Sequence, residues 1–216
     1  MKRLLAATLF CIAITLAGCG DDSIRPTFTT DILSDPAVDG YIAKTTLPTY
    51  FITQGMSPGV QSVFAGVDPV SGTEYRAFLH FPLGGPGGVP GSAIIASAYL
   101  DLYIDSIDTL GSSIPIRIEL VDLPSTTLVA SDYERAILLP LDFVTISPPI
   151  NSADVGNHVI VDVTRLMATA QHLGLPDFQL RILEDFGFVS PGVVEINDTT
   201  GASRGLLAPL LSVTYF

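Results

Sequence analysis

One stretch of the sequence alternates aromatic and acidic residues in a pattern that suits sugar recognition. Tyr99, Asp101, Tyr103 and Asp105 recur at every second position, so they would share one face of an extended strand. A tyrosine ring can stack on the C–H face of a sugar while a carboxylate accepts hydrogen bonds from its hydroxyls. Ordinary strand packing explains the same pattern, because tyrosine favours strands in general. We expect these residues to form a ligand face or a packed outer surface.

A second group of oxygen-bearing residues is a candidate calcium site. Asp39 comes early in the chain, and Glu195, Asn197 and Asp198 lie close together near its end. Calcium takes six to eight oxygen ligands, and a structural ion could tie the first and last strands of a β-sandwich together. No EF-hand spacing accompanies these residues. Solvated loop acids are therefore the alternative interpretation, and a structural calcium ion is the only cofactor that the sequence suggests.

No residue pattern indicates a catalytic centre. His80, His158 and His172 are scattered, without a metal-binding H-E-x-x-H spacing, and the sequence contains no G-x-S-x-G elbow. We expect no enzymatic activity. An enzyme of polysaccharide breakdown is the alternative, because the 22 acidic residues allow many carboxylate pairs.

The N-terminus reads as a secretion signal that ends at a cysteine. Lys2 and Arg3 precede 15 apolar or small residues, 4–18, a run that is short for a membrane-spanning helix and suits a signal peptide. The closing Leu-Ala-Gly-Cys resembles the lipobox of bacterial lipoproteins, in which the cysteine thiol accepts lipid, including palmitate. We expect a signal peptide over 1–18 and lipidation of Cys19. An ordinary cleaved signal and an uncleaved anchor helix are the alternatives.

Lipidation would place the protein in the cell envelope, with the membrane as its first partner. Two or more acyl chains make a stable anchor. Gly20 follows the cysteine, where an aspartate retains some lipoproteins in the inner membrane, so the outer membrane is favoured over the inner membrane. Residues 19–36 are polar and contain two prolines, and we expect them to form a flexible tether.

Charge and cysteine content limit the partners and the type of fold. Without Lys2 and Arg3, eight basic residues face 22 acidic ones, which gives a net charge of −14. This excess of acid argues against nucleic acid, which is bound through many Lys and Arg contacts to phosphate. Cys11 lies within the signal peptide, so the lipidated Cys19 would have no disulfide partner. The fold must then be stabilised by its hydrophobic core.

Strand-like alternation dominates the rest of the chain. Ala98, Leu100, Leu102 and Ile104 oppose the Tyr/Asp row described above. Comparable strands are expected over 75–83, 114–120, 158–163, 178–184, 193–197 and 210–216. One helix is expected over 164–174, with Thr164 as its N-cap, Gly174 as its stop, and a buried stripe of Leu166, Ala170 and Leu173. The stretch 123–150 shows no clear period.

Many short strands separated by Gly and Pro predict an all-β fold. We expect an antiparallel β-sandwich, a jelly roll with one short helix, as a single domain over 37–216.

The order of the strand motifs resembles the DNRLRE domains and related jelly-roll carbohydrate-binding modules. An Arg-initiated strand that ends in Phe is followed by an Ala-x-Leu-x-Leu-Tyr strand, an Asp-Val-Thr entry to a helix, and a Pro-x-Leu-x-Val-x-Tyr strand. The matching residues are Arg76, Phe81, Ala98, Leu100, Leu102, Tyr103, Asp162, Val163, Thr164, Pro209, Leu211, Val213 and Tyr215. The resemblance implies a jelly-roll fold and a binding role. We therefore expect a lipid-anchored, non-catalytic envelope protein that binds a glycan or a neighbouring protein, with a purely structural role as a further alternative.

Overall fold

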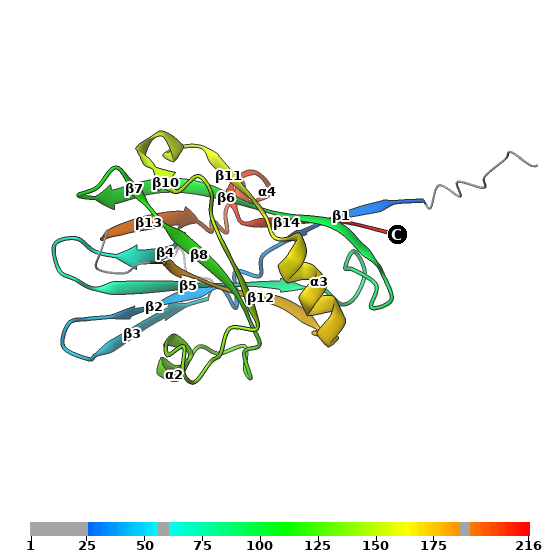
Figure 1. Ribbon diagram of the computed structural model, residues 1–216, viewed down its shortest axis with the longest axis horizontal. Coiled ribbons are helices and arrows are strands. Elements are labelled where there is room, and N and C mark those ends of the chain that lie inside the picture. The colour runs from blue at the N-terminus through cyan, green and yellow to red at the C-terminus, as the bar shows by residue number, and fades with distance from the viewer. Residues whose placement is uncertain (1–25, 56–60, 186–190) are drawn as a thin grey trace, which may run out of the picture.

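The protein folds as an antiparallel β-sandwich with short helices, as the sequence predicts. The structure is a computed structural model that describes residues 26–55, 61–185 and 191–216 (Figure 1). The expected signal peptide and Cys19 lie outside the described residues.

The elements follow one another in the order shown in Figure 1. The strands are β1 (Phe28–Leu33), β2 (Gly40–Lys44), β3 (Tyr50–Gln54), β4 (Ser62–Val67), β5 (Glu74–Pro82), β6 (Ile95–Thr109), β7 (Ser113–Ile114), β8 (Ile116–Val121), β9 (Asp142–Thr145), β10 (Ile150–Asn151), β11 (His158–Asp162), β12 (Asp177–Glu184), β13 (Gly192–Asn197) and β14 (Leu210–Tyr215). The helices are α2 (Ala130–Tyr133), the 3-10 helix η1 (Ser152–Asp154), α3 (Thr164–Leu173) and α4 (Arg204–Leu207).

Among the described residues, twelve strands form two halves that curl around a shared core, and β7 and β10 pair separately with each other. One half has the order β1-β14-β6-β13-β4, with β11 on β6, and the other half has the order β5-β12-β8-β9, with β2 and β3 attached to β5. The halves meet where β4 pairs with β5 through two residue pairs, Gly66 with Tyr75 and Val67 with Glu74. Strand β6 runs along the length of the molecule, from the end that carries β1 to the end that carries β7 (Figure 1).

The predicted inward rows form this core. Leu100, Leu102 and Ile104 of β6 are fully buried, and they share one cluster with Leu79 of β5 and Leu180 of β12. The row Ile114, Ile116, Ile118 and Leu120 is buried as well. Each buried aliphatic side chain of this kind stabilises the fold by roughly 1.5–3 kcal/mol. The alternation of apolar and polar residues in these strands therefore predicts correctly which side chains pack in the core.

The expected tether is too long at its C-terminal end, because the domain begins before residue 37. Residues 28–33 form β1, which pairs with β14 over six residues, from Phe28 opposite Tyr215 to Leu33 opposite Leu210. Ile32 is buried in the core while the polar neighbours face outward. A polar edge strand with a single core residue has the composition of a linker, which explains the wrong boundary.

The helix lies where the sequence predicts it, but two of its details differ. Val163 is the N-cap residue, and the Thr164 hydroxyl instead accepts a hydrogen bond from the Ala98 peptide N–H at 2.9 Å. Gly174 ends the helix in the left-handed conformation, as expected. Leu173 is exposed rather than buried, and Met167 takes its place in the core.

Much of the stretch without a clear period forms a cap over the outer face of the second half. This cap segment, residues 122–141, includes α2 and contributes Leu123, Leu128, Tyr133 and Leu138 to a second hydrophobic cluster. Its partners beneath are Ile42 of β2 and Phe78 of β5. Strand β12 is therefore buried on both faces.

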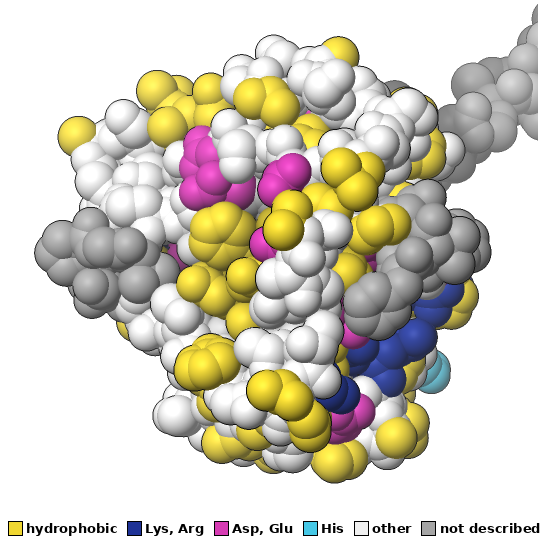
Figure 2. Space-filling model, turned by 90° about the vertical axis from the view of Figure 1, so that its left-hand side faces the viewer, with side chains coloured by type: hydrophobic (Ala, Val, Ile, Leu, Met, Phe, Trp, Pro, Cys, Tyr) yellow, Lys and Arg dark blue, Asp and Glu magenta, His cyan; other side chains and the backbone are white. Residues whose placement is uncertain are grey.

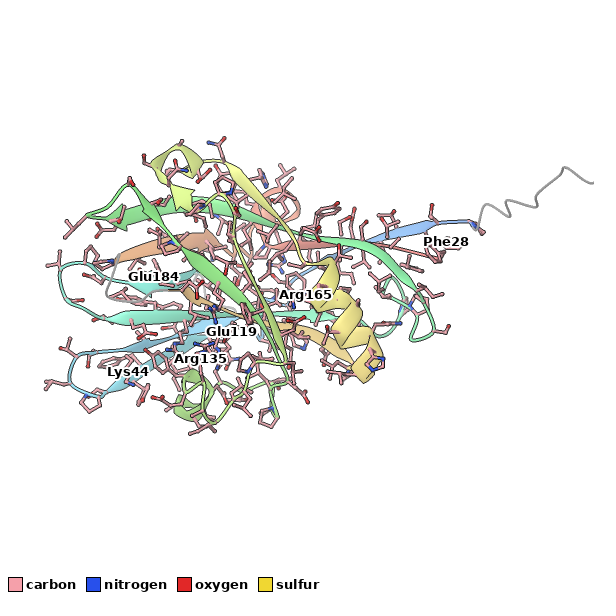
Figure 3. The ribbon with its side chains drawn as sticks, in the orientation of Figure 1. Phe28, Lys44, Glu119, Arg135, Arg165 and Glu184 are labelled. Carbon is pink, nitrogen blue, oxygen red and sulfur yellow. The ribbon has the colours of Figure 1, made fainter. Side chains whose placement is uncertain are left out.

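A buried ion pair fastens the cap segment to the sheet. The guanidinium of Arg181, which is fully buried, donates to Glu119 Oε2 from Nε at 2.9 Å and contacts it from Nη2 at 2.7 Å. The same guanidinium donates to the main-chain carbonyls of Asp132 and Leu138 at 3.0 and 2.9 Å. Figure 3 shows Glu119 over the sheet with Arg135 beneath it, toward α2. Because this cluster is sealed by the cap, we assign it to the stability of the fold.

Within residues 26–55, 61–185 and 191–216, no helix has the length and hydrophobicity needed to span a bilayer.

Candidate functional site

The Tyr/Asp row predicted from the sequence lies on the outer face of β6. Tyr99 is 44% exposed, and Asp101, Tyr103 and Asp105 are half-buried, while the residues between them are fully buried. The predicted orientation is therefore confirmed.

Part of this row is occupied by protein contacts. His158 of β11 lies opposite Tyr103, with the two rings edge to face at 5.1 Å, and its Nδ1 is 2.8 Å from Asp101 Oδ1. Asp105 accepts hydrogen bonds from Asn197 Nδ2 at 3.0 and 2.9 Å. These contacts leave Tyr99 as the freest aromatic side chain of the row.

A β-bulge changes which residues of β6 face outward beyond this row. Ile196 of β13 pairs with Ile104, but the preceding residue, Glu195, pairs with Ser106, so Asp105 is an extra residue in the ladder. A bulge shifts the alternation by one residue and re-aims the side chains that follow. Ser106 and Asp108 are consequently exposed. Without the bulge, their even-numbered positions would face the core, opposite to the predicted Tyr/Asp row.

Three aromatic rings form a cluster close to the outward-facing residues that follow the bulge. Tyr41 of β2 lies edge to face with Phe64 of β4, with ring centroids 5.1 Å apart at 81°. Tyr75 of β5 completes the cluster, with centroids 6.0 Å from Tyr41 and 5.9 Å from Phe64. All three side chains are partly exposed.

These rings line a pocket at the place where the two halves of the fold join. The cavity has a volume of about 320 Å³, and we call it the seam pocket. It is lined by Tyr41, Phe64, Asp68, Tyr75, Ser106, Asp108 and Val193. Most ligand sites are concave, with apolar walls and a few polar groups that orient the ligand. Figure 2 shows this end of the molecule, where acidic side chains lie directly beside hydrophobic ones.

A close approach of two glycines shapes this part of the sheet. Gly66 of β4 has a φ of +122°, and a Cβ built on it would lie 2.0 Å from the carbonyl oxygen of Gly192 in β13. Neither the backbone angle nor the space admits a side chain. The glycines therefore let β4 lie against β13 at the position where β4 also meets Tyr75.

The charge of the seam pocket is negative. Asp68 Oδ1 accepts the peptide N–H groups of Ser71 and Val70 at 2.7 and 2.8 Å, which holds the pKa of Asp68 below its usual range. Burial raises the pKa of Tyr75, and the neighbouring charge of Asp68 adds to the rise. Among the described residues that line the pocket there is no Lys, Arg or His. The pocket thus offers aromatic surface, a neutral phenol and carboxylates.

The candidate calcium ligands do not form one site. Asp39 and Asp198 are buried near each other, and the Arg204 Nη1 lies 3.4 Å from Asp198 Oδ1. Burial raises the pKa of Asp198 to about 6, and burial followed by the charge of Asp198 raises the pKa of Asp39. Arg204 supplies the positive charge that an ion would supply, and two carboxylates fall short of the six to eight oxygens that calcium takes. This pair does not fit a calcium ion.

The other two candidates lie on the outer face with the β6 row. Glu195 Oε2 accepts a hydrogen bond from the Ser106 hydroxyl at 2.6 Å. Asn197 donates hydrogen bonds to Asp105 through Nδ2. The Oδ1 of Asn197 accepts the peptide N–H of Thr199 at 3.0 Å. Within the described part of the chain, no group of three or more His, Cys, Asp or Glu residues is arranged to hold a metal.

The aromatic residues of the seam pocket were not singled out from the sequence. Tyr41, Phe64 and Tyr75 come from three different strands and share no spacing along the chain. No motif in the sequence marks them as members of one site. Only the pairing of β2 with β5, and of β5 with β4, brings the rings together.

A comparison with protein-family models and with curated proteins finds no match to this chain.

Proposed function

We propose that the protein is a lipid-anchored, non-catalytic component of the bacterial cell envelope that binds a glycan in the seam pocket. The observation that carries this proposal is the clustering of Tyr41, Phe64 and Tyr75 beside carboxylates on the outer surface. Aromatic rings stack on the apolar faces of sugars, and carboxylates accept hydrogen bonds from sugar hydroxyls. The volume of about 320 Å³ lies at the lower end of the range of small-molecule pockets.

The position of the pocket supports a role in display. In Figure 3, Phe28, at the start of the first strand, lies at one end of the molecule, and Glu184 lies toward the other. The turn between β4 and β5, which contributes Asp68 to the pocket, also lies at the end away from Phe28 (Figure 1). Lipidation at Cys19 would therefore leave the pocket on the side remote from the membrane anchor.

A glycan array probed with the mature protein in detergent tests the proposal. Tyr75→Ala should abolish most of the binding, because it removes one wall of the pocket. Tyr99→Ala is the matched control, since Tyr99 is an exposed tyrosine of the same outer surface without a described ring contact. Binding that survives Tyr75→Ala and is lost in Tyr99→Ala would instead locate the ligand on the predicted β6 row. An array without any bound glycan, or turnover of a bound polysaccharide, would contradict the proposal.

A further inference from the structure

Building on the proposed glycan-binding role, on which this step rests, we infer that the seam pocket selects glycans that carry free, protonated amino groups. The walls and the charges of the pocket both favour a cation. Aromatic rings attract an ammonium group through their negative faces, and Tyr41, Phe64 and Tyr75 are the three aromatic walls.

The carboxylates near the rings are not neutralised by the protein. Asp68 and Asp108 line the pocket, and Glu195 lies directly opposite Phe64 on the neighbouring strand. None of the three forms an ion pair with a described lysine, arginine or histidine. By contrast, Glu119, Glu134 and Asp142 are each paired with a basic side chain. In Figure 2 the Lys and Arg side chains gather in a different part of the view from the central acidic group.

Among the described contacts, the acids near the pocket accept hydrogen bonds from uncharged groups alone. Two peptide N–H groups donate to Asp68 and keep it ionised at neutral pH. The Ser106 hydroxyl donates to Glu195. Asp108 makes no described hydrogen bond or ion pair and is exposed, so its carboxylate is free to meet a ligand. An anionic sugar would face three uncompensated negative charges, whereas an amino sugar would neutralise them.

The test compares two ligands that differ only in the charged group. Binding of a glucosamine oligomer and of the N-acetylglucosamine oligomer of equal length is measured by calorimetry with the mature protein in detergent, at a pH where the free amine is protonated. We expect the glucosamine oligomer to bind about tenfold more tightly, because each ammonium can meet a ring face or a carboxylate. Its affinity should fall as salt is raised, since salt screens exposed charges.

Matched variants locate the effect. Asp108→Asn should weaken binding of the glucosamine oligomer by about three- to fivefold, as expected for one exposed charge pair, and should leave the acetylated oligomer unchanged. Asp122→Asn, another exposed aspartate but on the cap segment, should change neither. Equal, salt-independent binding of both oligomers would overturn the charge selectivity and leave glycan binding standing. If neither oligomer binds but another glycan binds on the array, the charge selectivity is again overturned and glycan binding still stands. An array without any bound glycan would overturn the proposed function, and the selectivity with it.

Discussion

At the scale of single residues, the most unusual group is a buried carboxyl at the seam between the two halves. Glu184 continues the inward row of Phe178, Leu180 and Ile182 on β12, but it is an acid in a position that is 5% exposed. Its two oxygens have no hydrogen-bond partner of ordinary geometry among the described residues. Burial raises the pKa of Glu184 to about 7.

This shift gives the fold a pH dependence of defined sign. Because the pKa of Glu184 is higher in the folded state than the 4.5 of an ordinary glutamate, its contribution to stability is complete below about pH 4.5 and is lost as the pH rises through about 7. Glu184→Gln keeps the shape and removes the titration. We expect the variant to match the native protein near pH 4.5 and to exceed it by up to about 3 kcal/mol at pH 8.

Chemical denaturation at both pH values measures this difference in the free energy of unfolding. Glu195→Gln is the control, because Glu195 lies on the outer face and its difference from the native protein should not change in the same way. A Glu184→Gln variant that is equally destabilised at both pH values would contradict the expected titration.

The Asp39–Asp198 pair supports a second residue-scale prediction. Since Arg204 already compensates Asp198, we expect the melting temperature to be the same with calcium and with chelator. A rise in melting temperature with calcium, abolished by Asp39→Asn, would show that the pair binds the ion after all.

At the scale of elements, β1 decides where the folded domain begins. Ile32 is its one core residue, and Phe28, in the same strand, is 56% exposed. Ile32→Ala should lower the free energy of unfolding by about 2–4 kcal/mol, because it leaves a cavity in the core. Phe28→Ala should cost at most about 1 kcal/mol. Equal and small effects of the two substitutions in denaturation curves would mean that residues 28–36 do act as a tether.

Strands with strict alternation are the elements that the sequence predicts well. β5, β11, β12, β13 and β14 all occur within one or two residues of the expected ranges, and β6 contains the expected alternating rows but extends to Thr109. β1 lacks this signal because only Ile32 is buried among its six residues. The cap segment lacks it because isolated residues, such as Leu128, Tyr133 and Leu138, reach the second cluster from irregular chain.

The sequence predicts only part of the candidate site, and there is a physical reason why the rest is not predicted. The outward orientation of Tyr99 to Asp105 follows from a period of two, so it could be read directly. The bulge at Asp105 breaks that period, and the sequence alone does not indicate where a ladder gains a residue. The seam pocket depends on pairing between strands that lie far apart in the chain, which local patterns do not encode.

At the scale of the whole molecule, the proposed lipid anchor would determine where the protein acts. If Cys19 carries the lipid, Cys19→Ser should move the protein from the membrane fraction to the soluble fraction and remove labelling by palmitate. Cys11→Ser is the control, because Cys11 lies within the expected signal peptide and should leave both readouts unchanged. Membrane association of the Cys19→Ser protein would contradict lipid anchoring at this residue.

The early start of β1 would also restrict how far the domain can stand from a lipid on Cys19. Eight residues separate Cys19 from Phe28, and at full extension they and their flanking bonds span about 30 Å. A partner would therefore have to lie close to the bilayer, because the anchored domain could not reach a partner far from the membrane surface. Lengthening the segment before Phe28 would be the direct way to ask whether that proximity matters to the cell.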